Sequence, residues 1–90
     1  MKAHAAVLLG CSWVLWQVTR DFTTLRPTYA VMQAEETKVA CEDQKRAKME
    51  RFAAVFPRQG DGLIMSGTDG KARALLSFDC LPDTVDPRSH

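Results

Sequence analysis

The chain has 90 residues, enough for one small domain, with 46% hydrophobic residues, 26% charged residues and a formal net charge of +1. This composition is typical of a globular chain and not of a disordered one. Lys2 is the only charged residue among the first ten, so residues 11–90 carry eleven basic and eleven acidic side chains. A domain without excess positive charge lacks the electrostatic signature of nucleic-acid binding, and we expect no nucleic-acid partner.

Residues 1–10 have the features of an export leader. Lys2 supplies a basic start, Ala5 to Leu9 form an apolar run, and the small residue Gly10 precedes Cys11. The run Leu8-Leu9-Gly10-Cys11 resembles a bacterial lipobox, in which the cysteine is lipidated and becomes the new N-terminus. We therefore predict lipidation at Cys11 and a lipid anchor on the periplasmic face of a bacterial membrane.

Two other interpretations of this segment stay open. The chain is exported but processed at another site and released into the periplasm, or it is a small cytosolic protein in which the segment is a buried strand and Cys11 an inert core thiol. A spanning helix is not expected, because the apolar stretch from Ala5 to Val18 has only 14 residues, fewer than the roughly 20 that cross a bilayer.

The first half of the domain predicts two strands and a helix. Residues 13–19 are rich in aromatic and β-branched side chains, which favours a strand, and residues 28–33 are a second strand candidate. In the first strand the alternate face with Val14, Trp16 and Val18 is wholly apolar, so we expect it to meet the core, with Trp13 partly exposed.

Thr37 can cap a helix that runs from Lys38 to about Phe56, just before Pro57. Apolar positions at steps of three and four predict its buried side, and the charged residues take the opposite, solvated side. The buried stripe consists of Cys41, Lys45, Met49, Phe52 and Phe56.

The second half predicts a turn over 58–62, a strand over 63–66, a tight turn at Asp69-Gly70 and a last strand over 72–80. The sequence thus predicts an α+β fold: an antiparallel sheet of about four strands in the order strand-strand-helix-strand-strand, with the helix on one face. The expected domain covers residues 11–82. Residues 83–90 form the tail of the chain. Pro82 precedes it and Pro87 lies within it, so we expect the tail to be extended.

Cys41 and Cys80 are the two cysteines of the domain body, and we predict a structural disulfide between the start of the helix and the end of the last strand. For a loop of about 40 residues, the chain-entropy estimate is roughly 4 kcal/mol of stabilisation. Reduced inert thiols and a redox function are the alternatives, but redox catalysis usually employs closely spaced thiols, and the chain has no Cys-x-x-Cys.

We predict no catalytic, cofactor-binding or metal-binding site, and no enzymatic activity. The only histidines, His4 and His90, lie at the two ends, where packing cannot position them. Asp83 and Asp86 are too few oxygen ligands for calcium, and we expect them to accept hydrogen bonds from backbone amides in turns. Gly60-Asp61-Gly62 lacks the strand-to-helix context of a phosphate loop.

Three parts of the sequence together resemble a group of small bacterial exported proteins. They are the Trp-rich run Cys11-Ser12-Trp13-Val14-Leu15-Trp16, a cysteine early in the helix, and the ending Cys80-Leu81-Pro82-Asp83-Thr84-Val85-Asp86-Pro87-Arg88. The proteins of that group begin with a leader and a Trp-rich strand and end on a Cys-x-Pro-Asp-Thr-Val-Asp-Pro-Arg tail. The resemblance implies export and a cysteine pair, and it implies no activity or catalytic residue.

Two functional hypotheses follow. The first is a non-enzymatic envelope protein, tethered to a membrane through Cys11, whose domain binds an envelope protein. The second is an inhibitor or ligand-binding accessory of a periplasmic enzyme, which inserts either the loop of residues 58–62 or the C-terminal tail into a cleft.

Overall fold

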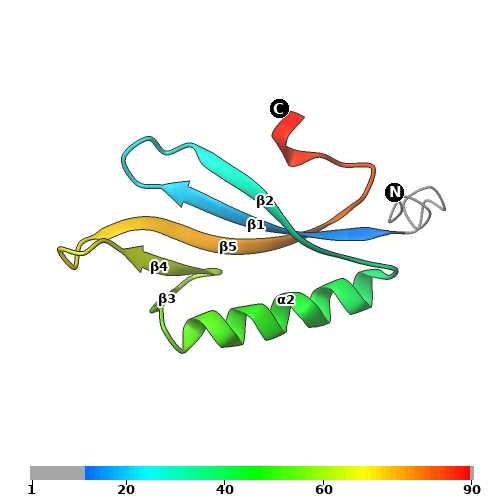
Figure 1. Ribbon diagram of the computed structural model, residues 1–90, viewed down its shortest axis with the longest axis horizontal. Coiled ribbons are helices and arrows are strands. Elements are labelled where there is room, and N and C mark those ends of the chain that lie inside the picture. The colour runs from blue at the N-terminus through cyan, green and yellow to red at the C-terminus, as the bar shows by residue number, and fades with distance from the viewer. Residues whose placement is uncertain (1–11, 90) are drawn as a thin grey trace.

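The computed structural model describes residues 12–89, which form an antiparallel β-sheet with one α-helix along one side (Figure 1). The sheet has five strands in the spatial order β2-β1-β5-β4-β3. The elements are β1 (Trp13–Asp21), β2 (Pro27–Glu35), α2 (Lys38–Ala53), β3 (Arg58–Gln59), β4 (Gly62–Ser66), β5 (Ala72–Pro82) and the 3-10 turn η1 (Pro87–Ser89). The α+β class and the single helix on one face are confirmed for this part of the chain, whereas the sheet has one strand more than the expected four.

The additional strand is β3, in the segment expected to be only a turn. Arg58 pairs with Leu63 and Gln59 with Gly62, so the chain reverses within two residues. Gly60 makes this reversal possible because its φ is +59°, a conformation that side chains with a Cβ rarely adopt. Gly62 is also required for steric reasons, since a Cβ there would come within 2.8 Å of the Leu76 carbonyl oxygen.

Strands β1 and β5 form the centre of the sheet. Their antiparallel register runs without interruption from the pair Trp13–Pro82 to the pair Asp21–Ala74. The pairing of β1 with β2 contains a bulge, because Leu15 lies opposite Gln33 while Trp16 lies opposite Val31. Each of these strands extends by one or more residues beyond the segment that the sequence predicted, because pairing with its neighbours continues past the apolar run.

The core lies between the sheet and α2. The buried residues that form it are Leu15, Cys41, Leu63, Leu76 and Phe78. The ring of Phe52 from the helix stacks on Phe78, with 5.8 Å between centroids and 13° between planes. Thr37 caps the helix as expected, because its hydroxyl oxygen accepts a 3.1 Å hydrogen bond from the Ala40 amide. The helix ends at Ala53, three residues earlier than predicted, and Val55 and Phe56 close its last turn by donating to the Phe52 carbonyl oxygen.

The Trp16 face of β1 is buried, as expected, but it does not face the helix. Leu15 lies opposite Cys80, and Cys80 must face the helix because it is bonded to Cys41. The alternation along a strand then places Trp16 and Val18 on the other side of the sheet, where they are nevertheless buried, at 4% and 6% exposure. Trp13, which is half-buried, packs against the helix-side core instead.

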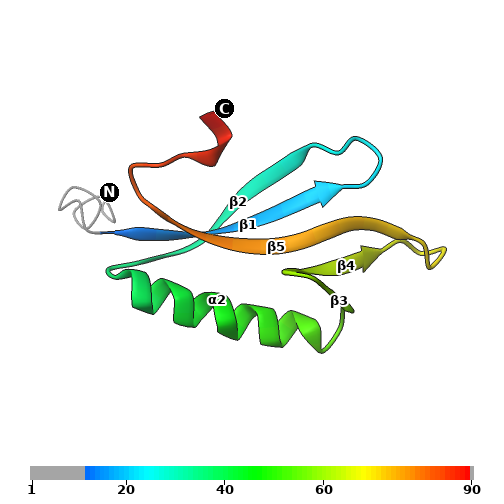
Figure 2. The ribbon, with the colours of Figure 1, turned by 180° about the vertical axis from the view of Figure 1, so that it is seen from behind.

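The C-terminal segment provides part of the cover over that second side. After β5 the chain turns back across the sheet, on the side opposite α2, as the two views show (Figures 1 and 2). The Asp83 amide donates to the Ser12 carbonyl oxygen, and the Val85 amide donates to the Pro82 carbonyl oxygen. The tail therefore differs from the extended segment that the sequence predicted, since proline at 87 begins the 3-10 turn η1.

Candidate functional site

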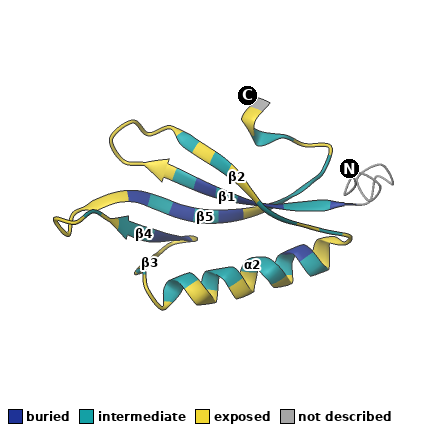
Figure 3. Cartoon of the chain, in the orientation of Figure 1, coloured by how far each residue is buried: buried dark blue, intermediate teal, exposed yellow. Residues whose placement is uncertain are grey.

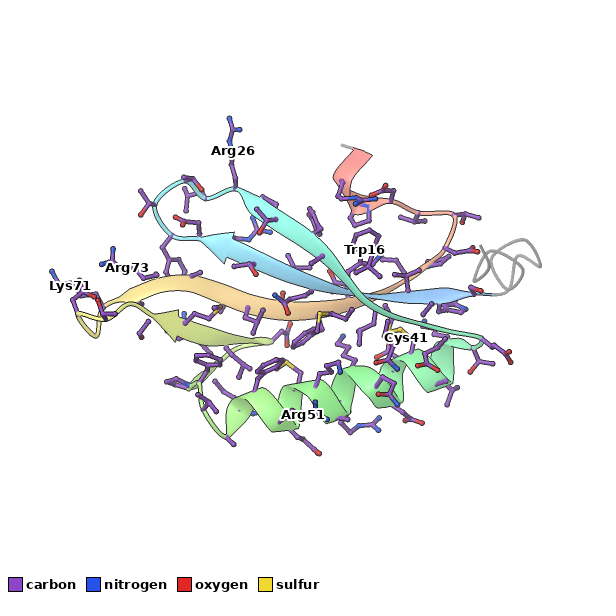
Figure 4. All side chains as sticks on the ribbon, viewed as in Figure 1. Trp16, Arg26, Cys41, Arg51, Lys71 and Arg73 are labelled. Atoms are coloured by element: carbon purple, nitrogen blue, oxygen red, sulfur yellow. A yellow bond between two sulfur atoms is a disulfide. The ribbon has the colours of Figure 1, made fainter. Side chains whose placement is uncertain are left out.

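The disulfide between Cys41 and Cys80 joins the first turns of α2 to β5, as the sequence predicted. Its two Cα atoms are 6.1 Å apart, and 39 positions separate the cysteines in sequence (Figure 4). Cys41 is fully buried and Cys80 is half-buried, and both pack in the core between α2 and the sheet. Persistent structural disulfides are typical of oxidising compartments.

The two sides of the sheet are covered to different extents. Burial is concentrated along β1, β5 and the helix-facing half of the molecule, while β2 carries several exposed positions (Figure 3). On the side opposite α2, an open groove of about 810 Å³ separates the start of β2 from the C-terminal segment. Its lining residues are Arg26, Pro27, Thr28, Tyr29, Leu81, Val85, Pro87 and Arg88. The groove thus combines apolar walls with two guanidinium groups.

Arg88 forms one rim of the groove and is held in place from two sides. Its guanidinium lies over the Trp16 ring, 5.0 Å from the centroid, in a cation–π contact. Its Nε and one Nη each donate to the Asp86 carboxylate at 2.9 Å, and the Arg88 backbone amide also donates to Asp86. These hydrogen bonds, with the charge of Asp86, raise the pKa of Arg88 above its usual range. Asp86 thus accepts a backbone amide hydrogen bond, as predicted, and in addition fixes the orientation of Arg88.

Trp16 lies beneath this contact and is the central residue of the open side (Figure 4). The Tyr29 ring meets it edge-on, with 6.4 Å between centroids and 89° between planes. The Trp16 indole Nε1 is buried and has no hydrogen-bond partner among residues 12–89. A buried donor without a partner destabilises a fold by about 1–3 kcal/mol.

The connection between β1 and β2 exposes apolar side chains on a hydrogen-bonded turn. The Asp21 carboxylate accepts hydrogen bonds from the Thr23 and Thr24 amides at 2.6 and 3.1 Å, and the Leu25 amide donates to the Asp21 carbonyl oxygen at 2.7 Å. Leu25 has a φ of +61° and is 65% exposed, and Phe22 is 40% exposed. The amides of Thr24 and then Thr23 lower the pKa of Asp21.

Sequence reasoning passed over this loop as a plain connection. One signal was Asp21 at the start of the connection, because an aspartate side chain commonly accepts a hydrogen bond from the amide two residues later and so closes a turn. Two large apolar residues in a connection of five were the second signal.

The remaining predicted sites are placed as follows. Cys11, the predicted lipidation site, lies outside the described residues, as do His4 and His90. Of the Gly60-Asp61-Gly62 run, Gly60 and Asp61 form the β3–β4 turn and Gly62 begins β4. Within residues 12–89, no group of three or more acidic, histidine or cysteine side chains is arranged to hold a metal ion. In the same part of the chain, no helix has the length and apolar character that crossing a bilayer requires.

Comparison with known proteins adds no relative: no family model, no curated protein and no solved structure matches this chain.

Proposed function

We propose that the protein is a non-enzymatic, exported protein-interaction domain, tethered to a bacterial membrane through lipid at Cys11. The observation that carries the proposal is the contrast between a helix-side core stapled by Cys41–Cys80 and an opposite side that keeps a groove open. The disulfide supports a location outside the reducing cytoplasm, and the lipobox-like run before Cys11 supports the tether.

The groove suits a segment of an envelope protein that carries an apolar side chain beside a carboxylate. Leu81 and Val85 supply apolar contact, while Arg26 supplies a positive charge that no acidic side chain among residues 12–89 neutralises. Aromatic and arginine side chains of this kind are also the residues that contribute most at protein interfaces.

Two measurements test this function. Cys11→Ser should abolish acyl labelling and release the protein from membranes; unchanged partitioning of the variant would contradict the tether. A photo-crosslinking residue at exposed Thr28, in the groove, should capture a defined envelope protein from intact cells, and the same probe at exposed Val39 on α2 should not. Val85→Asp should remove the Thr28 crosslink, and the matched substitution Val55→Asp should leave it unchanged.

A second candidate function is inhibition of a periplasmic enzyme by insertion of a loop. The structure favours the β1–β2 loop for this role over the two segments suggested by sequence, because Leu25 is exposed and held in a left-handed conformation by a hydrogen-bonded turn. Preorganisation of an inserting loop increases affinity by reducing the entropy lost on binding. If the Thr28 probe captures a hydrolase, Leu25→Asp should abolish inhibition of that hydrolase, and Val39→Asp should not.

A further inference from the structure

Two connections of the sheet lie side by side at one end of the molecule, which we call the tip. The tip consists of residues 20–26, which contain the β1–β2 loop, and residues 67–73, which contain the β4–β5 hairpin. The Phe22 amide donates to the Arg73 carbonyl oxygen at 2.9 Å, so the two segments are joined through the backbone. Both views place the two connections together, at the end of β1 away from its first residue (Figures 1 and 2).

The tip exposes two large apolar side chains, Phe22 and Leu25. Leu25 has a φ of +61°, a conformation that is costly for a residue with a Cβ and that glycine adopts freely. A hydrogen bond of 2.7 Å from the Leu25 amide to the Asp21 carbonyl oxygen closes this turn. The chain therefore keeps a large apolar side chain in solvent at a position where glycine would be less strained. A strained residue of this kind suggests a function for its side chain outside the fold.

The tip also carries an excess of positive charge. Residues 11–90 balance eleven basic with eleven acidic side chains, whereas the tip has four basic and two acidic ones. Both acidic side chains are engaged: Asp21 accepts hydrogen bonds from two backbone amides, and Asp69 pairs with Arg73 at 2.9 Å. The three other basic residues, which are all exposed and form no ion pair within the described part of the chain, are Arg20, Arg26 and Lys71.

This combination fits the surface of an anionic membrane. Apolar side chains bind at the boundary between headgroups and acyl chains, and lysine or arginine side chains beside them are attracted to anionic headgroups. Figure 4 shows Arg26 and Lys71 pointing away from the sheet at this end of the molecule. A protein cleft that accepted Leu25 would need acidic side chains placed to match each of these cations, whereas an anionic lipid surface offers negative charge in every direction.

We propose that the tip binds anionic lipid, with Phe22 and Leu25 at the boundary between headgroups and acyl chains and with the unpaired cations of the tip on the lipid phosphates. Because the tip lies at the far end of β1 from Cys11, this contact is separate from the lipid anchor proposed there. It is also separate from the proposed binding of a protein in the groove, since neither Leu25 nor Lys71 lines the groove.

The test is flotation with vesicles, on the full chain carrying Cys11→Ser so that no lipid anchor contributes. We expect binding to phosphatidylcholine vesicles in which about a quarter of the lipid is phosphatidylglycerol, and binding at least about tenfold weaker to pure phosphatidylcholine. Added salt should weaken the binding because it screens the attraction between the cations and the headgroups. Residues 1–10 are present in every variant, so differences between variants report on the tip.

The charge variants measure the contribution of the basic side chains. Lys71→Gln and Arg20→Gln should each lower the partition coefficient about fivefold, since a lysine or arginine near an anionic surface contributes about that factor. The matched control Arg51→Gln removes the same charge from α2, which is exposed there and labelled in Figure 4, and should leave the partition coefficient unchanged.

The apolar contribution is measured with Leu25→Gly. Loss of the side chain should lower the partition coefficient about tenfold, while the melting temperature should not fall, because glycine adopts the positive φ without strain. The matched control Val39→Ala trims an exposed apolar side chain at the start of α2, and it should leave the partition coefficient unchanged.

A chain that binds neither kind of vesicle would overturn the proposal, including the case in which the β1–β2 loop inserts into an enzyme cleft instead. Binding that Leu25→Gly does not weaken, or that Arg51→Gln weakens as much as Lys71→Gln does, would overturn it too, because the contact would then lie elsewhere on the chain. Membrane release of the Cys11→Ser variant in cells is a separate result, which bears on the anchor and not on the tip.

Discussion

The two sides of the sheet differ in how closely their side chains are packed. On the side of α2, the buried residues form one cluster, aromatic rings stack, and a disulfide ties the helix to β5. On the other side, Arg88 and the edge of Tyr29 contact the Trp16 ring, its indole Nε1 has no partner in the described part of the chain, and a groove remains open nearby.

This difference indicates a division of labour within a small domain. A chain of 90 residues buries a limited core, and such domains commonly rely on a staple. In this interpretation the helix side and the disulfide supply most of the stability. The other side then needs less close packing, and its apolar and cationic groups can stay accessible. The predictions below test whether stability and accessibility are in fact separated in this way.

The largest effect is expected from a truncation on the helix side. Phe78 is 2% exposed and stacks on Phe52, so Phe78→Ala should lower the free energy of unfolding by about 3–5 kcal/mol through lost contacts and a cavity. Trp16→Phe should cost much less, because it keeps a ring and removes the unpartnered indole nitrogen. Urea denaturation of both variants measures the contrast; a larger loss for Trp16→Phe would show that the open side carries the stability.

The next effect concerns the disulfide. Changing both Cys41 and Cys80 to alanine should lower the free energy of unfolding by about 2–5 kcal/mol, mainly because the unfolded chain becomes less restricted. Thermal denaturation should show a lower melting temperature, and added reductant should lower the melting temperature of the wild type but not that of the double variant. Peptide mapping that finds both thiols free in protein purified without reductant would contradict a structural role for the bond.

The sequence predicted those features that depend on local chemistry. The Thr37 cap, the helix stripe and the hairpin at Asp69-Gly70 were all visible, because a side-chain oxygen, a periodicity and a glycine act within a few residues. The cysteine pair was predicted for another reason, since Cys41 and Cys80 remain once Cys11 is assigned to lipidation.

The features that it missed depend on partners distant in the chain. Residues 13–18 are apolar on both faces, so no local pattern tells which face meets the helix; the pairing of Leu15 with Cys80 decides it. The tail was expected to be extended because a proline-containing segment forms no regular strand hydrogen bonds. In the structure, however, the Arg88 guanidinium packs on the Trp16 ring. The groove exists because this long-range contact positions the tail, so no local sequence motif could predict it.

A smaller effect is expected where the tail meets the sheet. Arg88→Met keeps much of the side-chain volume but removes the cation–π contact and the side-chain hydrogen bonds to Asp86, so it should lower the stability of the fold only slightly. Hydrogen exchange should become faster at the amides of Asp83 and Val85, with little change in α2. Equal acceleration in both regions would mean that the tail and the helix side unfold as one unit, which would weaken the comparison between the two sides.

The smallest effect is a pH-dependent loosening of the β1–β2 loop. The amides of Thr24 and Thr23 lower the pKa of Asp21 from its ordinary value of 3.8. A carboxyl whose pKa is lower in the folded state stabilises the fold above its unfolded pKa, and that contribution is lost as the pH falls through the folded value. The amide resonances of Thr23 and Thr24 should therefore shift with a midpoint below pH 3.8. Asp21→Asn keeps an acceptor oxygen but does not titrate, so its two amides should show no such step. A midpoint above 3.8 in the wild type would mean that the Asp21 turn does not hold Leu25 in solution, and the insertion hypothesis for this loop would lose its structural basis.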